Sequence, residues 1–204
     1  MDEELRAELL RRMEKDQVAR KALDPEGMRA ADEENLPWLR GVIAEHGWPG
    51  ASLVGDDGAH AAWLLAQHAD ADPAFQRRCL DLLAAAVEAG EATERERAYL
   101  TDRVLLAEGE PQVYGTQVRR VGEHFEPCEL GDPDGVDERR AAVGLEPLAE
   151  YLSKFGSGGV PRAQLKCPGC GGWVPFEPAA DGEPITVTCP ECSLETTMRL
   201  KRRG

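Results

Sequence analysis

The sequence predicts a mainly α-helical bundle that carries a small β-hairpin and is followed by a short β-rich unit. Three observations support this fold class. Alanine and leucine supply most of the 42% hydrophobic residues, whereas aromatic residues make up only 5%, and alanine is the residue that costs least in a helix. Apolar residues recur at helical spacing through the first half of the chain. Near the C-terminus, two C-x-x-C pairs enclose short runs that are typical of strands.

The N-terminal segment is expected to form a first helix over residues 3–23. Its apolar residues recur every fourth position on one face, and they are Leu5, Leu9 and Met13. Asp24 precedes Pro25, and a residue before proline avoids the helical region. This pair should therefore end the first helix.

A second helix is expected to begin near Asn35, whose side chain can cap it. Pro37 would then lie in the first turn, where its missing N–H does no harm. Gly47 can supply the left-handed residue that ends the helix.

Three more helices are expected before residue 110. The third covers residues 57–69 and is apolar over much of its circumference. The fourth follows Asp72, which can cap it ahead of a proline in the first helical position. Thr93 and Glu96 form a capping box for the fifth, which runs to about residue 108.

The pattern changes after Pro111. Residues 112–119 and 124–130 read as the two strands of a hairpin. Two short helices are expected after it, over residues 137–143 and 147–154.

A glycine-rich run sets the expected domain organisation. Residues 156–159 read Gly-Ser-Gly-Gly, a composition typical of flexible linkers. We therefore expect an acidic helical domain at residues 1–155, a linker at 156–163 and a second unit at 164–204.

The net charge of −14 lies in the expected helical domain. Residues 164–204 hold five basic and five acidic side chains, whereas the first 163 residues hold 19 basic and 33 acidic ones. Such a surface repels phosphate backbones, so non-specific nucleic-acid binding is not expected. A protein partner or a small molecule fits better, although solubility alone would explain the same charge. The oligomeric state stays open.

No apolar run approaches the length of a membrane span, since the most apolar stretch covers only residues 59–66. The N-terminus reads Met-Asp-Glu-Glu-Leu, which is acidic where a secretory signal is basic. We expect a cytoplasmic protein that does not enter the membrane.

The two C-x-x-C pairs predict a metal site. They are separated by eighteen residues, a spacing typical of zinc sites. Four thiolates form a closed tetrahedral shell with no open position, so the ion would be structural. The sequence thus predicts a C-terminal zinc ribbon with one structural zinc ion, held by Cys167, Cys170, Cys189 and Cys192.

Two alternatives for these cysteines are disfavoured. Disulfides do not suit a protein without a secretory signal, and a redox dithiol would need a helix start in a βαβ context. The basic tail at residues 199–203 could touch phosphates. However, the segment between the pairs carries three acidic residues, and four thiolates leave a zinc centre negative. A structural or protein-docking role is therefore favoured over nucleic-acid recognition.

Polar residues on apolar helix faces are the candidate catalytic residues. His68 follows two leucines by three and four positions, so it points to the apolar side of the third helix. Asp102 has apolar neighbours on its own face, and an unpaired buried carboxylate is very costly. His68, Arg103 or Tyr114 could be its partner. These four residues form either an acid–base site or a structural polar network.

A second group of polar side chains is expected to bind a ligand, and its members are Gln67, Gln112, Thr116 and Gln117. Strand alternation would place Gln112, Tyr114 and Thr116 on one face of the hairpin and Gln117 on the other. This face could line a pocket for a small polar molecule, or it could face solvent.

Short motifs in a fixed order carry a family resemblance. They include Gly-Trp-Pro at residues 47–49, Gln-His-Ala-Asp at 67–70, Tyr-Leu-Thr-Asp-Arg-Val at 99–104 and Tyr-Gly-Thr-Gln at 114–117. In this succession, residues 30–150 resemble a bacterial family of unknown function. The resemblance implies a domain but no activity, and the zinc ribbon lies beyond it.

Two functions follow from these observations. The first is a non-enzymatic binding or adaptor protein that joins an acidic helical domain to a structural zinc ribbon. The alternative is an enzyme that performs acid–base chemistry on a small molecule in a pocket of the helical domain, using His68, Asp102, Arg103 and Tyr114.

Overall fold

The computed structural model describes the chain except for residues 122–123, 157–162, 167–172, 177–183, 189–194 and 200–204. The chain divides into two compact units. The first contains residues 1–120 and 126–151, and the second contains residues 121–125 and 152–204.

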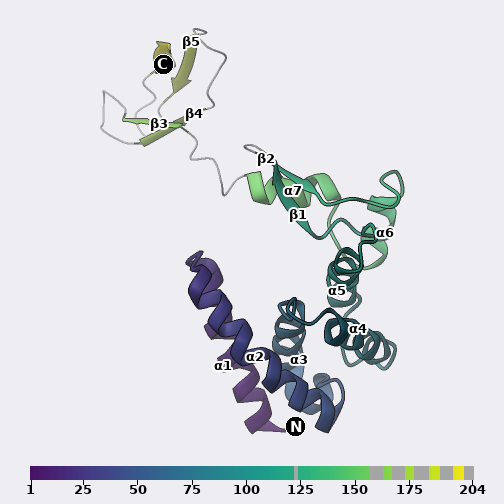
Figure 1. Ribbon diagram of the computed structural model, residues 1–204. Coiled ribbons are helices and arrows are strands. Elements are labelled where there is room, and N and C mark those ends of the chain that lie inside the picture. Colours follow the sequence, from purple (N-terminus) through teal and green to yellow (C-terminus); the bar gives the residue numbers. More distant parts are fainter. Residues whose placement is uncertain (122–123, 157–162, 167–172, 177–183, 189–194, 200–204) are drawn as a thin grey trace. The chain divides into compact units, whose positions relative to one another are not determined.

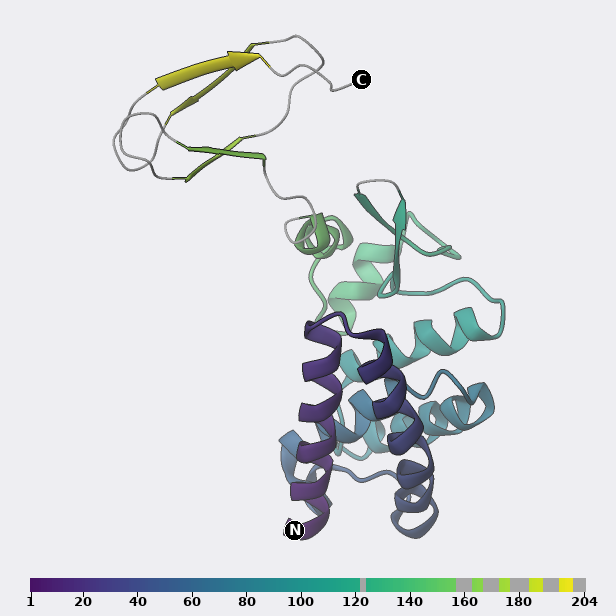
Figure 2. The same ribbon diagram turned by 60° about the vertical axis from the view of Figure 1, so that its left-hand side comes forward.

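The first unit is mainly helical, as expected (Figures 1 and 2). Its helices are α1 (Glu3–Lys21), α2 (Pro25–His46), α3 (Ala51–Gln67), α4 (Pro73–Glu88), α5 (Glu94–Ala107) and α6 (Val136–Ala142), and α7 (Leu148–Gly156) begins in it. Helices α1 and α2 form an antiparallel hairpin, α3 packs against α1, and α4 packs against α5. None of the helices in the described ranges is long and apolar enough to cross a membrane.

Side-chain caps start two of these helices where the sequence predicted them. Asp72 accepts a hydrogen bond from the backbone N–H of Phe75 (3.2 Å) at the start of α4. At the start of α5, Thr93 and Glu96 form the predicted capping box, with both reciprocal bonds present. Each such cap stabilises its helix by about 1 kcal/mol.

The predicted start of the second helix was wrong. Helix α2 begins ten residues earlier, at Pro25, and Asp24 caps it by accepting the N–H of Glu26 (3.2 Å). An Asp-Pro pair both ends one helix and begins the next, because proline suits the first helical position. Asn35 is instead buried within α2, and Pro37 lies inside the helix. The buried face of α2 extends on both sides of Pro37, and its packing offsets the hydrogen bond that proline removes.

The third helix also begins earlier than predicted, at Ala51, but it is broken at Gly55. This residue has φ 74° and ψ 166°, which is not helical. Its positive φ is a conformation that side chains other than glycine's rarely adopt. The helix resumes after this break, close to the predicted start at residue 57, and it ends at Gln67 with His68 as the C-cap.

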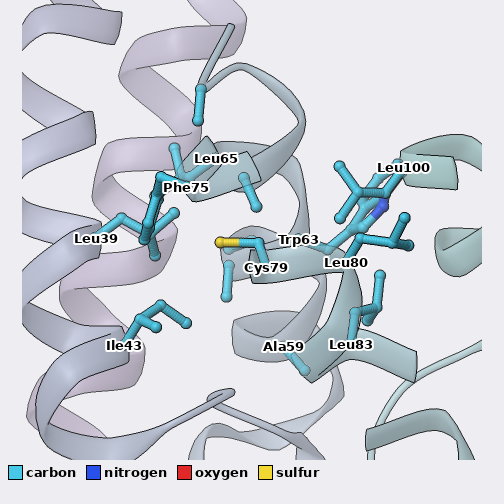
Figure 3. Close-up of a cluster of buried hydrophobic side chains, with 14 of the residues drawn as sticks. Leu39, Ile43, Ala59, Trp63, Leu65, Phe75, Cys79, Leu80, Leu83 and Leu100 are labelled. Atoms are coloured by element: carbon cyan, nitrogen blue, oxygen red, sulfur yellow. The ribbon is translucent and has the colours of Figure 1, made fainter. Parts of the chain in front are cut away.

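The hydrophobic core lies where α2, α3, α4 and α5 meet, and Leu9 of α1 adds to it. In Figure 3, Leu39 and Ile43 of α2 face Leu65 of α3 and Cys79 of α4, while Leu80, Leu83 and Leu100 gather around Trp63. The Trp63 indole donates a hydrogen bond to the Glu96 carbonyl (2.8 Å). Its one polar atom is therefore satisfied inside the core.

The predicted hairpin is present but shorter than expected. Strand β1 (Val118–Val121) pairs with β2 (His124–Pro127) in a two-stranded sheet. The prediction of a strand from residue 112 was wrong, because residues 113–117 follow an irregular path and only Gln112 makes an isolated bridge, to Leu130. The strand alternation expected for Tyr114 and Thr116 therefore does not apply.

The second unit contains two antiparallel strand pairs. Strands β3 (Ala163–Lys166) and β4 (Trp173–Phe176) form one pair, and β5 (Pro184–Thr188) and β6 (Glu195–Arg199) form the other. The sequence predicted strand-like runs between the two C-x-x-C pairs, where β4 and β5 lie. The four cysteines of the predicted zinc ribbon, and most of the predicted linker, lie outside the described residues.

Candidate functional site

Asp102 organises the loop that follows α5. Its carboxylate is fully buried and accepts hydrogen bonds from the backbone N–H groups of Val113 (2.8 Å), Tyr114 (3.0 Å) and Thr116 (2.8 Å). Three such bonds compensate a buried carboxylate without a cationic partner. The expected contact between Asp102 and His68 is not among the contacts of either residue with the described part of the chain.

The carbonyl groups of the same loop are also fixed by hydrogen bonds. Arg140 is fully buried and donates to the carbonyl of Tyr114 (2.7 Å), and the hydroxyl of Tyr151 donates to the carbonyl of Thr116 (2.7 Å). Burial raises the pKa of Tyr151, which keeps this hydroxyl a donor. The loop between Val113 and Thr116 is thus fixed through both its N–H and its C=O groups.

The glutamines near this loop are used in the same way. The side chain of Gln112 donates to the carbonyls of Gln117 (3.0 Å) and Cys128 (2.8 Å), and it accepts the N–H of Gln117 (3.0 Å). The Gln117 amide donates to the hydroxyl of Thr116 (3.1 Å). Three of the four predicted ligand-binding residues, Gln112, Thr116 and Gln117, are therefore bonded to one another.

His68 belongs to a different group of residues. Its ring nitrogen Nδ1 lies 3.0 Å from Oδ2 of Asp16 in α1, and Asp16 is fully buried. A carboxylate on Nδ1 fixes both the orientation of an imidazole and its tautomer, which leaves Nε2 for other partners. Within the described residues, Nε2 has no hydrogen-bond partner.

Asp16 is itself held in place by two further donors. Arg20 donates to Oδ1 (2.9 Å) and Gln17 to Oδ2 (2.9 Å), and Arg20 also bonds to Asp32 of α2 (2.6 Å). Burial opposes the charge of Asp16, but the hydrogen bonds and the charge of His68 outweigh it and hold the pKa of Asp16 below its usual value. For Asp32, burial outweighs the nearby Arg20, so its pKa is raised.

A cleft of about 580 Å³ opens beside His68. The apolar residues that line it are Pro25, Met28, Leu36 and Ala71, and the polar ones are Arg29, Asp32, Glu33, His68 and Asp70. Most of the surface inside the cleft is apolar, because the polar residues also contribute their carbon atoms, and this surface and the size of the cleft are typical of small-molecule sites. The cleft lies between the first half of α2 and the segment that follows α3.

Arg103 and Gln67 lie near this second group. Arg103 donates to Oδ2 of Asp70 (2.7 Å), and Gln76 donates to Oδ1 of Asp70 (3.1 Å) and to the carbonyl of Gln67 (3.1 Å). The Gln67 side chain is buried, and its Nε2 has no partner among the described residues. The structure therefore brings Arg103 to Asp70, two residues after His68, whereas the carboxylate of Asp102 on α5 binds the fixed loop that contains Tyr114.

A family model described as "Family of unknown function (DUF6624)" matches residues 3–158. The chain belongs to this family. The resemblance to a family of unknown function is thus confirmed, over a longer stretch than the motifs indicated. No curated protein and no solved structure matches the chain.

In this DUF6624 chain, Asp16 is the site residue that the sequence analysis missed. A signal was available, because Asp16 follows Leu9 by seven residues and therefore lies on the same apolar face of α1. A buried acidic residue on such a face requires a partner. The partner could not be identified from the sequence, since His68 is 52 residues away.

One group of side chains in the described part of this DUF6624 domain has the composition of a metal site. It consists of Asp16, Asp32 and His68, whose potential ligand atoms lie within 4.8 Å of one another. Arg20 bonds to both carboxylates of this group. A metal ion here would have to compete with a cation that the chain already supplies.

Proposed function

We propose that this chain is a binding protein whose helical unit holds a small ligand in the cleft beside His68. A zinc ribbon completes it, with one structural zinc ion on Cys167, Cys170, Cys189 and Cys192. This proposal keeps the binding function predicted from the sequence and assigns it a site.

The observation that carries the proposal is the pairing of Asp16 with His68 at the wall of the cleft. A buried carboxylate costs free energy unless it is paired, and Asp16 is held by His68, Arg20 and Gln17. A purely structural network would need no free polar atom beside an open cavity. Here Nε2 of His68 has no partner in the described part of the chain, and His68 lines a cleft of about 580 Å³. A directed polar group in an apolar cleft is characteristic of a ligand site.

The test is a fragment screen on the full-length, zinc-loaded protein, read out by backbone amide chemical shifts. We expect fragments to shift the amides of Met28, Leu36 and Ala71. Ala71→Trp should abolish these shifts by filling the cleft, since Ala71 is exposed and lines it. Ala89→Trp is the matched control, because Ala89 is an equally exposed alanine outside the cleft. Fragment binding that persists in Ala71→Trp would contradict the proposal.

A second candidate function, acid–base catalysis, is favoured by the same pair of residues. With Nδ1 bonded to Asp16, the Nε2 lone pair of His68 can accept a proton from a bound molecule, and Asp16 would stabilise the imidazolium that forms. This version of the predicted enzyme keeps His68 and adds Asp16. Asp102 and the backbone of Tyr114 are engaged in the fixed loop.

The reactivity of His68 tests this second function. Diethyl pyrocarbonate acylates unprotonated imidazole nitrogens, and mass spectrometry can follow each histidine separately. We expect His68 to react several-fold more slowly in Asp16→Asn, whereas His46 should be unaffected. Equal rates for His68 in both proteins would rule out activation by Asp16.

The zinc ribbon is supported by the cysteine spacing and by the strands around it. Each C-x-x-C pair follows a strand directly, since Cys167 comes after β3 and Cys189 after β5. Four thiolates suit Zn²⁺ in a structural site, where binding of the metal contributes free energy of folding. A protein partner is the proposed target of this unit, because its charges balance and do not favour phosphate binding.

A further inference from the structure

The cleft beside His68 contains hydrogen-bond acceptors that no described residue uses. Arg20 bonds to Oδ1 of Asp32 and leaves Oδ2 without a partner. Glu33 makes no hydrogen bond or ion pair with the described part of the chain, and Nε2 of His68 has none either. The lining of the cleft thus offers three acceptors from two neighbouring helical segments.

The charges around the cleft have an excess of acid. Three of its lining residues are acidic, and Arg29 is the basic one. Arg103 compensates Asp70, and Arg20 is shared by Asp16 and Asp32. The negative charge of Glu33 and part of that of Asp32 are left uncompensated by these two arginines, and Arg29 supplies one positive charge nearby. A positively charged group is therefore attracted to this end of the cleft.

The acceptors suit an ammonium group in number and in charge. A primary ammonium has three N–H donors. Asp32 and His68 are close neighbours, since one carboxylate oxygen of Asp32 and one ring nitrogen of His68 lie within 4.8 Å of each other, and an ammonium nitrogen bonds to its acceptors at about 2.8 Å. A metal ion is less suited to this place, because it would compete with Arg20, which already bonds to the carboxylates of Asp16 and Asp32.

Apolar side chains form another part of the wall of the cleft. Met28 and Leu36 of α2 line it together with Pro25 and Ala71. These side chains can bury a short hydrocarbon tail, which contributes about 0.8 kcal/mol for each CH₂ group. Methionine is unbranched and adapts to tails of different shape.

From this arrangement we infer that the ligand of the cleft is a primary amine with a short apolar tail. The ammonium group bonds to Asp32, Glu33 and His68, and the tail lies on Met28 and Leu36. This inference rests on the proposed binding function and specifies the class of its ligand.

The experiment compares three probes with the same tail, which are hexylamine, hexanol and hexanoate. Each is titrated into the full-length, zinc-loaded protein, and the amide shifts of residues lining the cleft report binding. We expect hexylamine to bind at least tenfold more tightly than hexanol or hexanoate. Propylamine should bind more weakly than hexylamine, because its tail buries less surface.

Three substitutions on consecutive residues of α2 provide the specificity test. Asp32→Asn and Glu33→Gln should each weaken hexylamine binding, by roughly tenfold and at least threefold, respectively. Glu34→Gln removes the same charge from the next residue, which bonds to Lys15 (2.6 Å) and does not line the cleft. We expect it to change the affinity less than twofold. Equal losses in all three variants would show that hexylamine senses only the general negative charge, and would overturn the inference.

The outcomes also separate this inference from the proposed function. Shifts in the cleft with hexanol or hexanoate, but not with hexylamine, would refute the amine and leave the binding site standing. Absence of shifts in the cleft with every probe and every fragment would refute both. The last measurement adds Mn²⁺ to the protein. If Mn²⁺ broadens the amide signals beside Asp16 and His68 and hexylamine does not bind, the group is a metal site instead.

Discussion

The carboxylate of Asp16 and the imidazole of His68 connect α1 to the end of α3, with 3.0 Å between Oδ2 and Nδ1. The two residues are 52 positions apart in the sequence. Asp16 is fully buried, whereas the side chain of His68 keeps 13% of its surface exposed. The pair therefore has one end in the interior and the other beside the cleft. This makes it both a structural link and a candidate binding group, and substitution can separate the two roles.

Asp16→Ala should destabilise the protein by about 2–4 kcal/mol, because it leaves Arg20 and His68 without their buried partner. Urea denaturation of the helical unit, followed by circular dichroism, measures the change. Glu14→Ala is the control on the same helix, since Glu14 is exposed, and it should change the stability by no more than about 0.5 kcal/mol. Similar effects of both substitutions would mean that the Asp16 network contributes little.

The contribution of Asp16 to the stability of the fold should depend on pH. Its folded-state pKa lies below the usual value, so its stabilising effect is present above the unfolded-state pKa of about 3.9 and is lost as the pH falls below it. The difference in unfolding free energy between the wild type and Asp16→Asn should shrink as the pH falls below about 4. A difference that grows on acidification would contradict the predicted sign.

The prediction of the fold succeeded where local signals decide the structure. The Thr93–Glu96 capping box and the Asp72 cap are complete within four residues, and both helix starts were predicted correctly. The start of α2 was missed because Asp24-Pro25 carries two local meanings, and only the packing around Asn35 and Pro37 decides between them.

The site was harder to predict, because its contacts join distant segments. The sequence indicated that Asp102 is buried and requires a partner, and both are correct. Its partners are backbone N–H groups 11, 12 and 14 residues later, and side-chain types carry no signal for these. His68 was recognised as a polar residue on an apolar face, but its partner on α1 depends on how α1 packs against α3.

Asp102→Ala should release the loop from Val113 to Thr116. The substitution leaves one buried and two partly buried N–H groups without an acceptor, so we expect a loss of about 2–4 kcal/mol. Hydrogen exchange gives a more specific readout, because the amides of Val113, Tyr114 and Thr116 should lose protection. Glu110→Ala is an exposed control nearby. Unchanged protection of the three amides would show that Asp102 does not hold the loop.

The two described free cysteines should differ in reactivity. Cys79 is fully buried in the core shown in Figure 3, and burial raises the pKa of its thiol to about 12. The thiolate is the reactive form, so iodoacetamide at pH 7.5 should leave Cys79 unmodified in the folded protein. Cys128 is half-buried and should react first. Peptide mapping after unfolding in urea is the control, since both cysteines should then react. Modification of Cys79 in the folded state would indicate that this part of the core opens.

Removal of metal should act on the second unit alone. We expect one zinc ion per chain in protein purified without chelator, bound to Cys167, Cys170, Cys189 and Cys192. Because so short a unit has little core of its own, its folding depends on the metal. A chelator should therefore collapse the amide spectrum from about residue 165 onward, while the helical circular dichroism signal of α1–α5 stays within a few per cent.

Cys167→Ser combined with Cys189→Ser should reproduce this effect without chelator, whereas Cys128→Ser should retain the zinc. Elemental analysis that finds no zinc in the wild type would remove the proposed ribbon, and loss of helical signal on chelation would show that the two units do not fold independently.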